Sequence, residues 1–280
     1  MSDMTTTPQE LWLVGAGRMG LALLEGWVKA GIVSAAAPAR IVEPNPSDAL
    51  QGLVTQKAVR LAAPPFSASA PPLVVLAVKP QMLPAALPTL RPLVAKGASV
   101  VSIIAGRTVD YIREGLGAPA GLAIVRAMPN TPAAIGKGIS TMFAGADVND
   151  GLRALAERLL AAAGAVVWVE REELIDAGTA ISGSGPAYFF LLVEALANAG
   201  TGLGLSRATA EKLARETLIG SGALLAASAE TPAALRDAVT SPGGTTRAAL
   251  DVLMAADGLS PLMRRAVEAA FARAKELGKA

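Results

Sequence analysis

A glycine-rich segment, Gly15-Ala-Gly-Arg-Met-Gly20, has the composition of a phosphate-binding turn. It follows the apolar run Leu11–Val14 directly and leads into a helical pattern between Arg18 and Ala30. In this context the first glycine permits a tight turn, the second lets a pyrophosphate approach the backbone, and the third lets helix and strand pack closely. Free N–H groups at the helix start then face the phosphates. We therefore expect a dinucleotide to contact Gly15, Ala16, Gly17, Arg18, Met19 and Gly20.

An acidic side chain extends this expected site. Glu43 ends the apolar run Arg40–Glu43, at the place where dinucleotide-binding folds carry an acid for the adenosine ribose hydroxyls. A carboxylate there would repel a 2′-phosphate, so Glu43 predicts that NADH is used at least as well as NADPH. The alternative is a glutamate turned to solvent before Pro44.

Two further apolar runs, Leu73–Val78 and Ser99–Ile104, should end at the same crevice. Ligands of open parallel sheets lie beyond the carboxyl ends of the strands. Lys79 would then meet a phosphate or a ribose, or else it is a solvated lysine at a strand end. The residues expected at the cofactor from these two runs are Ala77, Val78, Lys79, Pro80, Ile104 and Ala105.

Amide and hydroxyl side chains gather in three later segments. Arg126–Pro132 holds Asn130 between two prolines that fix the backbone. Asn130 is a candidate amide for the nicotinamide or the substrate, or an ordinary turn residue. Ser182–Tyr188 and Ser241–Thr246 are small, hydroxyl-rich turns before helical patterns. Such turns suit a carboxylate, and they equally suit a helix cap.

The chain contains no histidine and no cysteine in its 280 residues. The commonest general base, thiolate nucleophiles and disulfides are therefore excluded. Hydroxyls, carboxylates, lysines, backbone amides or an organic cofactor must carry any chemistry. We predict no metal site.

Composition limits the class of protein further. Hydrophobic residues make up 52% and charged residues 17% of the chain, which is typical of a globular protein, and the net charge of +2 comes without a basic run. We therefore expect no nucleic-acid partner. The polar segment Met1–Glu10 is unlike a signal peptide, and apolar runs such as Leu159–Val169 are shorter than the ~20 residues that span a bilayer. These features predict a cytoplasmic protein without a membrane partner.

Short β-rich runs alternate with helical patterns through the first half, which favours an α/β Rossmann-type doubly wound parallel sheet. The proline-rich stretches Pro64–Pro72 and Pro80–Pro92 predict loops or broken helix starts. The expected strands are Leu11–Val14, Arg40–Glu43, Leu73–Val78, Ser99–Ile104, Ala123–Arg126 and Val166–Val169.

After about Glu170 the pattern becomes helical, as in Leu203–Ala229 and Leu262–Leu277. Thr231-Pro232 is typical of a helix start. We expect residues 1–170 to form a NAD(P)-binding Rossmann domain and residues 171–280 an all-α dimerisation and substrate domain. Because this half is rich in Ala and Gly and poor in aromatic residues, we expect a homodimer or a higher homo-oligomer to complete its core.

Five segments, in order along nearly the whole chain, resemble the pyrroline-5-carboxylate reductase family. The last two are far more specific than the glycine-rich turn alone. The matching segments are Val14–Gly20, Ala77–Pro80, Arg126–Pro132, Ser182–Tyr188 and Ser241–Thr246.

The resemblance implies NAD(P)H-dependent reduction of 1-pyrroline-5-carboxylate to L-proline, with a helical domain that interlocks with a second subunit. It implies that Thr246 is the catalytic contact to the ring nitrogen. It further implies that Ser241 and the amides of Gly244 and Thr245 hold the carboxylate, and that Glu172 lines the pocket. Asn130 is the remaining substrate candidate.

One departure from the family concerns the adenosine side of the cofactor. The asparagine that the family places before its Lys-Pro strand has no clear counterpart, since this region reads Ala63-Pro64-Pro65.

Reduction of a cyclic imine suits a chain without histidine, since an iminium is already electrophilic and orientation supplies most of the advantage. A 3-hydroxyacid dehydrogenase of related layout would need a lysine on the first helix of the second domain, and Ala187–Ala199 contains none. The other alternative is a sensor that binds the dinucleotide without turnover.

Overall fold

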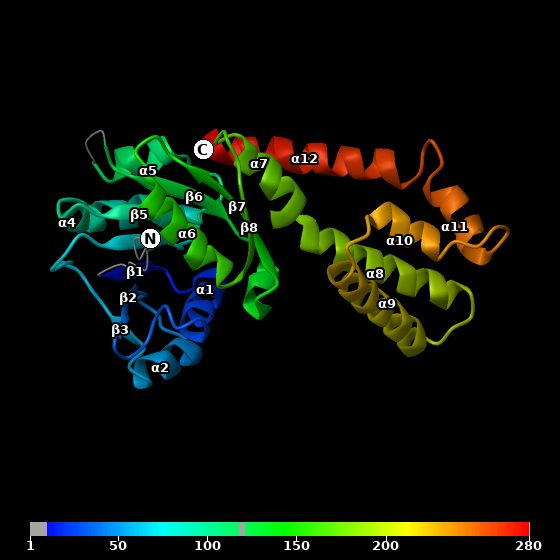
Figure 1. Cartoon of the computed structure of the whole chain (residues 1–280), viewed down its shortest axis with the longest axis horizontal. Helices are drawn as coiled ribbons and strands as arrows, with labels where there is room; N and C mark the ends of the chain where they lie inside the picture. Colours follow the sequence, from blue (N-terminus) through cyan, green and yellow to red (C-terminus); the bar gives the residue numbers. More distant parts are fainter. Residues whose placement is uncertain (1–9, 118–120, 280) are drawn as a thin grey trace. The chain divides into compact units, whose positions relative to one another are not determined.

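The computed structural model describes residues 10–117 and 121–279. The chain divides into two compact units (Figure 1). The sheet unit consists of the residues up to Ser184 together with the C-terminal residues from Ala270, and the helical unit consists of Gly185–Ala269. The division therefore falls later than the boundary expected after residue 170, and the end of the last helix belongs with the sheet unit.

The described part of the sheet unit contains an eight-stranded sheet with strand order β3-β2-β1-β4-β5-β6-β7-β8. Strands β1 to β6 pair in parallel, β7 runs antiparallel to β6, and β8 is parallel to β7. The strands are β1 (Leu11–Val14), β2 (Ala39–Val42), β3 (Val59–Leu61), β4 (Leu73–Leu76), β5 (Ser99–Ser102), β6 (Ile124–Met128), β7 (Gly138–Ala144) and β8 (Gly164–Trp168).

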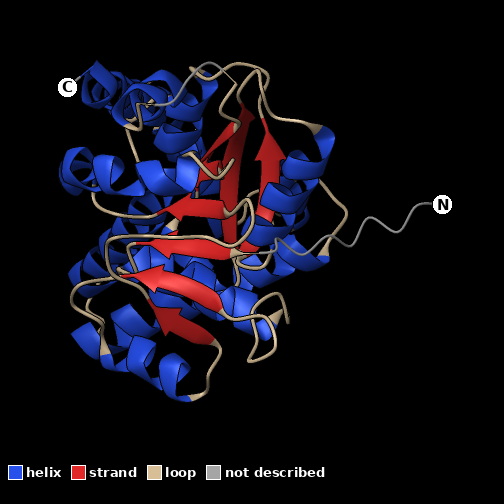
Figure 2. Cartoon of the chain, turned by 90° about the vertical axis from the view of Figure 1, so that its left-hand side faces the viewer, coloured by secondary structure: helices blue, strands red, loops and turns tan. Residues whose placement is uncertain are grey.

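Helices cover both faces of this sheet (Figure 2). Successive side chains of a strand point to opposite faces, so a strand that is apolar throughout must be covered on both. In β1, Leu11 and Leu13 pack into one core cluster, while Trp12 and Val14 pack into the other. The first cluster includes residues of α1 (Arg18–Lys29), α2 (Asp48–Thr55) and α6 (Asp150–Ala161), and the second includes residues of α5 (Val109–Gly115). The predicted doubly wound arrangement is confirmed.

Local signals fix where several of these helices begin. The side chains of Ser47, Thr108 and Asn149 each accept a hydrogen bond from a first-turn amide, and thereby cap α2, α5 and α6. The proline-rich stretch after Lys79 forms four short helical turns, each with a proline at its first or second position, as expected for broken helix starts. These turns are η1 (Pro80–Met82), α3 (Leu83–Ala86), η2 (Leu87–Leu90) and α4 (Arg91–Val94).

The expectation missed two strands, β3 and β7. Strand β3 is only three residues long, and two of them are exposed, so it carries no apolar run. Strand β7 follows the 3-10 turn η3 (Thr131–Ile135) and contains Gly, Ser and Thr, so it lacks the continuous apolar run that marked the predicted strands. The sheet is consequently mixed at one edge and not parallel throughout. Expected strand ends also shift, since β4 and β5 each stop two residues before Val78 and Ile104.

From Leu174 onward the described chain is helical apart from connecting turns, as predicted. Thr231 caps the helix that Pro232 opens, also as predicted. The helix start expected at Ser182–Tyr188 is present, since a helix begins at Gly185, but the turn expected before it is replaced by a π-helical segment, η4 (Thr179–Gly183). The elements are α7 (Leu174–Gly178), α8 (Gly185–Gly202), α9 (Arg207–Ala227), α10 (Pro232–Ala238), α11 (Thr245–Leu253) and α12 (Leu259–Lys279).

The helical run Leu174–Gly202 has 29 residues, and an apolar window within it has a mean hydropathy of 1.3 and is 17% buried. By length and composition alone this run is sufficient to cross a membrane. Ser182–Gly185 predicts a turn, so the sequence pattern does not indicate one continuous helical run here. A single helix of this kind is weak evidence for a span, since an apolar helix at a protein interface has the same composition.

Candidate cofactor and substrate sites

The glycine-rich turn connects β1 to α1 and packs against the backbone at the carboxyl end of β4. Gly15 has a φ of +95°, and a Cβ atom there would lie 2.8 Å from the carbonyl carbon of Ala77 and from the amide nitrogen of Val78. A Cβ at Gly20 would lie 2.3 Å from the carbonyl oxygen of Gly15. Only glycine fits at these two positions, so the turn and helix α1 are held tightly against the sheet.

Gly17 differs from the other two glycines because a Cβ atom there would meet nothing within 4 Å. Gly17 is the N-cap of α1, and no side chain caps this helix. The first-turn amides of α1 are therefore open to an external acceptor, and the partial positive charge of the helix start favours an anion. This cradle fits the pyrophosphate of a dinucleotide.

The other predicted cofactor residues follow the carboxyl ends of β4 and β5. The order β2-β1-β4 places the turn where strand order reverses, which is the usual ligand position in such sheets. Ala77 and Val78 are half-buried, and Lys79 is exposed immediately before η1. Ile104 is only 3% exposed, with its side chain in the core. Its expected cofactor contact is therefore restricted to backbone atoms.

Glu43 lies directly beside the glycine-rich turn. Its Oε2 accepts a hydrogen bond from the amide of Ala16 at 2.9 Å, and its Oε1 accepts one from the amide of Asn45 at 3.0 Å. The alternative of a side chain turned away into solvent is therefore wrong. Two backbone donors hold the carboxylate at the end of β2, next to the cradle.

Asn130 is 8% exposed, and both ends of its amide are hydrogen-bonded within the sheet unit. Its Nδ2 donates to the carbonyl oxygen of Ser182 at 3.1 Å, and its Oδ1 accepts from the amide of Ile139 at 2.9 Å. Asn130 thus ties η4 to the start of β7. This observation favours a structural role over the expected contact with nicotinamide or substrate.

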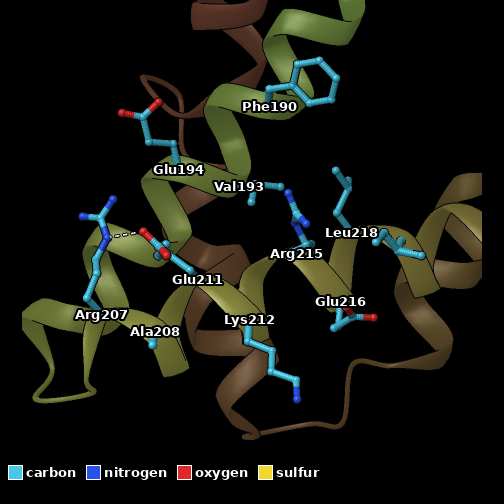
Figure 3. A pocket seen from close by; sticks show the side chains of 12 residues that line it. Phe190, Val193, Glu194, Arg207, Ala208, Glu211, Lys212, Arg215, Glu216 and Leu218 are labelled. Carbon is cyan, nitrogen blue, oxygen red and sulfur yellow. Dashed lines mark hydrogen bonds and ion pairs between the residues drawn. The ribbon is translucent and has the colours of Figure 1, made fainter. Parts of the chain in front are cut away.

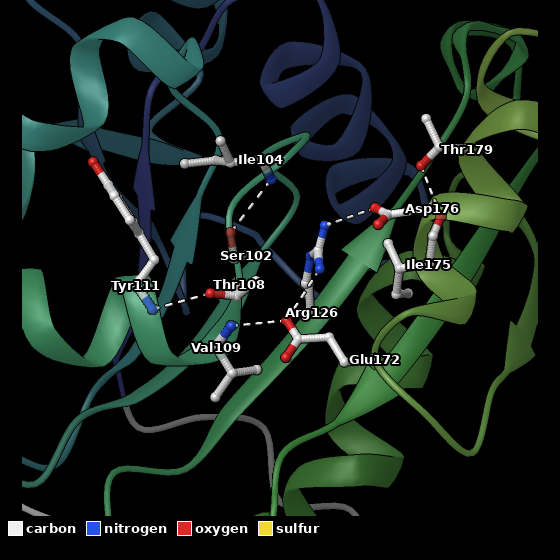
Figure 4. Close-up of polar contacts among 10 residues, drawn as sticks. All are labelled: Ser102, Ile104, Thr108, Val109, Tyr111, Arg126, Glu172, Ile175, Asp176 and Thr179. Atoms are coloured by element: carbon white, nitrogen blue, oxygen red, sulfur yellow. Dashed lines mark hydrogen bonds and ion pairs between the residues drawn. The ribbon is translucent and has the colours of Figure 1, made fainter. Parts of the chain in front are cut away.

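Arg126 on β6 was not among the predicted site residues, although it begins the segment Arg126–Pro132. Its side chain is 4% exposed and forms ion pairs with two carboxylates, 3.0 Å from Glu172 Oε1 and 3.6 Å from Asp176 Oδ1 (Figure 4). The same oxygen of Glu172 accepts a hydrogen bond from the amide of Val109 at 2.8 Å. The network joins β6, the start of α5 and the start of α7.

Glu172 was expected to line the substrate pocket, and this network supplies its Oε1 with two partners inside the sheet unit. Removing one member of a buried ion pair leaves an uncompensated charge, which costs about 3–5 kcal/mol. The residue types alone gave no signal for this pairing, because Arg126 and Glu172 are 46 positions apart.

The segment Ser241–Thr246 forms a turn at the start of α11 in the helical unit. Gly243 has a φ of +70°, and the amide of Gly244 donates to the carbonyl oxygen of Ser241 at 3.0 Å. This hydrogen bond within the turn therefore competes with the expected donation of the Gly244 amide to a substrate carboxylate. Gly244 is the N-cap and provides no side-chain cap, so the amides of Thr245 and Thr246, in the first turn of α11, have no acceptor within the helix.

The helical unit also contains a hollow of about 970 Å³ between α8 and α9 (Figure 3). Its lining combines apolar residues such as Phe190 and Val193 with the ion pair of Arg207 and Glu211. None of the predicted site residues lines it. Among the described residues, no group of three or more Asp, Glu, His or Cys side chains is arranged to hold a metal ion.

A glycine-rich turn at the strand-order reversal of a doubly wound sheet, followed by an all-helical region, defines a Rossmann-type dinucleotide-dependent oxidoreductase. Residues 10–106 match the family model of NADP oxidoreductase, coenzyme F420-dependent. Residues 172–277 match the family model of pyrroline-5-carboxylate reductase dimerisation.

Relatives of known name extend this match to the full chain, which belongs to the pyrroline-5-carboxylate reductase family. The pyrroline-5-carboxylate reductase of Pseudomonas aeruginosa is 38% identical over 98% of both chains. That of Synechocystis is 40% identical, over 96% of this chain and 98% of the relative.

Solved structures agree with this assignment. A pyrroline-5-carboxylate reductase from Coxiella burnetii superposes with a TM-score of 0.88 at 34% identity, over 98% of this chain and all of the other. The pyrroline carboxylate reductase of Plasmodium falciparum, solved with NADP bound, gives a TM-score of 0.77 at 28% identity, over 96% of this chain and 98% of the other.

Proposed function

We propose that this chain catalyses the NAD(P)H-dependent reduction of 1-pyrroline-5-carboxylate to L-proline. The observation that carries the proposal is the match to a reductase of that name over 98% of both chains, in a protein whose glycine-rich turn is open at Gly17. We further propose that the glycine-rich turn, Glu43 and the ends of β4 and β5 hold the cofactor.

When bound, the reduced nicotinamide supplies the hydride for the imine carbon. The protein must then orient the ring and provide a hydrogen bond or proton at its nitrogen. In this proposal, Thr246 provides that contact through its hydroxyl, and Ser241 with the amide of Thr245 holds the carboxylate. Orientation of this kind lowers the barrier without a strong general base, which agrees with the absence of histidine.

The two alternatives to this reaction are a 3-hydroxyacid dehydrogenase and a dinucleotide sensor. Helix α8 contains no lysine, which disfavours a 3-hydroxyacid dehydrogenase that relies on one there. A sensor would bind the dinucleotide without turnover. We expect the purified protein to oxidise NADH or NADPH when 1-pyrroline-5-carboxylate is added, and not with the cofactor alone. Cofactor binding without any oxidation would instead support the sensor.

We also propose that the protein is an obligate homodimer or a larger homo-oligomer. Helices α8 and α9 expose large apolar side chains, including Phe190 at 66%, Leu191 at 64% and Ile219 at 57%. Contiguous apolar surface of this kind marks an interaction site, and here it coincides with the region that matches a dimerisation family. A second copy as its partner also accounts for the apolar composition of Leu174–Gly202 without a membrane. Cytoplasmic location stays a prediction.

The oligomer prediction is tested by analytical ultracentrifugation at micromolar protein concentration. We expect a species of at least two chains, and we expect Phe190→Glu, which places a charge on the exposed face of α8, to shift the population towards monomer. A parent protein that sediments as a fully active monomer would contradict the prediction.

A further inference from the structure

We propose that Glu43 makes this enzyme prefer NADH over NADPH. The inference rests on the proposed function and names the cofactor within it. It goes beyond the relatives, since the Plasmodium falciparum structure was solved with NADP bound. Three features of the structure support it: the position of the Glu43 carboxylate, the charges of the segment that follows β2, and the partners of Arg40.

Two backbone hydrogen bonds hold the carboxylate of Glu43 in one position. Each of its oxygens accepts a bond from a backbone amide, Ala16 at 2.9 Å and Asn45 at 3.0 Å. Ala16 belongs to the glycine-rich turn, so the charge lies beside the cradle at Gly17. Because a carboxylate accepts up to about four hydrogen bonds, both oxygens keep lone pairs for ribose hydroxyls.

The segment after β2 offers no cation to a 2′-phosphate. Between Arg40 and Lys57 the sequence contains two acidic residues, Glu43 and Asp48, and neither Lys nor Arg. Folds of this type that accept a 2′-phosphate use a nearby Arg for it. Arg18 is exposed in the first turn of α1, next to the glycine-rich turn, and we expect it to face the pyrophosphate that both cofactors share.

Arg40, on the same strand, contacts Glu10 and Trp12. Its Nε lies 3.4 Å from Glu10 Oε2, and its guanidinium lies 5.3 Å from the centre of the Trp12 ring. Burial alone would raise the pKa of Glu10, but hydrogen bonds from Ser69 and Trp12 and the charge of Arg40 hold that pKa below its ordinary value. Arg40 therefore pairs with Glu10, and among the residues that the structure describes no Lys or Arg forms an ion pair with Glu43.

A 2′-phosphate placed beside this carboxylate would meet a like charge in a partly desolvated site, while ribose hydroxyls would donate to it. This difference predicts that NADH is favoured by about 10- to 100-fold in kcat/KM. The same ratio should appear in binding of the adenosine half alone, because the discriminating contact does not involve the nicotinamide.

The test is calorimetric titration with ADP-ribose and with its 2′-phosphate, together with kcat/KM for NADH and NADPH. Glu43→Ser should reduce or reverse the preference, since it removes the charge and adds a neutral donor. Glu43→Gln keeps an acceptor for Ala16 and should change the ratio in the same direction. Asp48→Ser is the control, because Asp48 is exposed on the same segment and carries the same charge.

A parent protein that binds the 2′-phosphate as tightly as ADP-ribose would overturn the inference, and so would an unchanged ratio in both folded Glu43 variants. An equal change in Asp48→Ser would also overturn it, by assigning the effect to net charge. Thermal unfolding shows that each variant is folded. Failure of the proposed function would appear separately, as fragment binding with the expected ratio but no oxidation of either cofactor by 1-pyrroline-5-carboxylate.

Discussion

Replacement of Thr246 by valine should lower kcat by about 10²- to 10³-fold, which is the usual cost of losing one donor positioned at a developing charge. Valine keeps the shape of threonine and removes only the hydroxyl. Thr246 lies in the first turn of α11, on a helix whose N-cap, Gly244, makes no side-chain hydrogen bond. The fold should therefore tolerate the change. Cofactor affinity should stay near the parental value, because Thr246 is proposed to contact the substrate.

Thr55→Val serves as the control for the loss of a threonine hydroxyl. Thr55 is exposed at the end of α2, where its hydroxyl donates to the carbonyl oxygen of Gln51. Steady-state kinetics with saturating cofactor should show parental kcat in this control. Parental kcat in Thr246→Val as well would remove Thr246 from the mechanism, whereas equal losses in both variants would point to an effect on the fold.

Alanine at Gly17 and alanine at Gly20 should both lower activity when the cofactor is not saturating, for different reasons. At Gly20 the new Cβ would lie 2.3 Å from the carbonyl oxygen of Gly15, so α1 must move from the sheet. Such overpacking lowers the free energy of unfolding by about 1–3 kcal/mol. At Gly17 the Cβ meets no protein atom within 4 Å and instead occupies the proposed pyrophosphate position. Stability should be kept there, while dinucleotide affinity falls by about 10- to 100-fold.

Gly52→Ala is the matched control, since Gly52 lies on α2 and a Cβ there also meets nothing within 4 Å. It should gain about 0.5–1 kcal/mol of stability and bind cofactor normally. Thermal unfolding and calorimetric titration of the three variants separate the two effects. Normal dinucleotide binding by Gly17→Ala would show that the pyrophosphate does not approach the backbone there.

The sequence was sufficient to predict the parts of the fold that depend on neighbouring residues. The run Leu11–Val14 is apolar throughout because both faces of β1 are covered, and the glycines after it are required by local contacts. Caps and proline starts, such as Thr231-Pro232 before α10, are likewise local signals. These features allowed the doubly wound sheet, the dinucleotide turn and the helical second half to be predicted.

Contacts between distant residues could not be predicted in this way. Nothing in the sequence around Asn130 indicates that its side-chain amide is hydrogen-bonded to the backbone of both Ser182 and Ile139. The pairing of Glu172 with Arg126 is equally invisible, and it gives Glu172 a structural role that family resemblance did not suggest. The π-helical segment at Ser182 was missed for a related reason, because Ser and Gly normally favour turns.

The most direct test of the proposed reaction uses a reduced cofactor that carries deuterium at the transferred position of C4. After incubation with 1-pyrroline-5-carboxylate, the product is examined by mass spectrometry and NMR. We predict L-proline with one deuterium at C5, the former imine carbon, formed in proportion to the cofactor oxidised. Cofactor that remains reduced while bound to the folded protein, with no proline formed, would contradict the account.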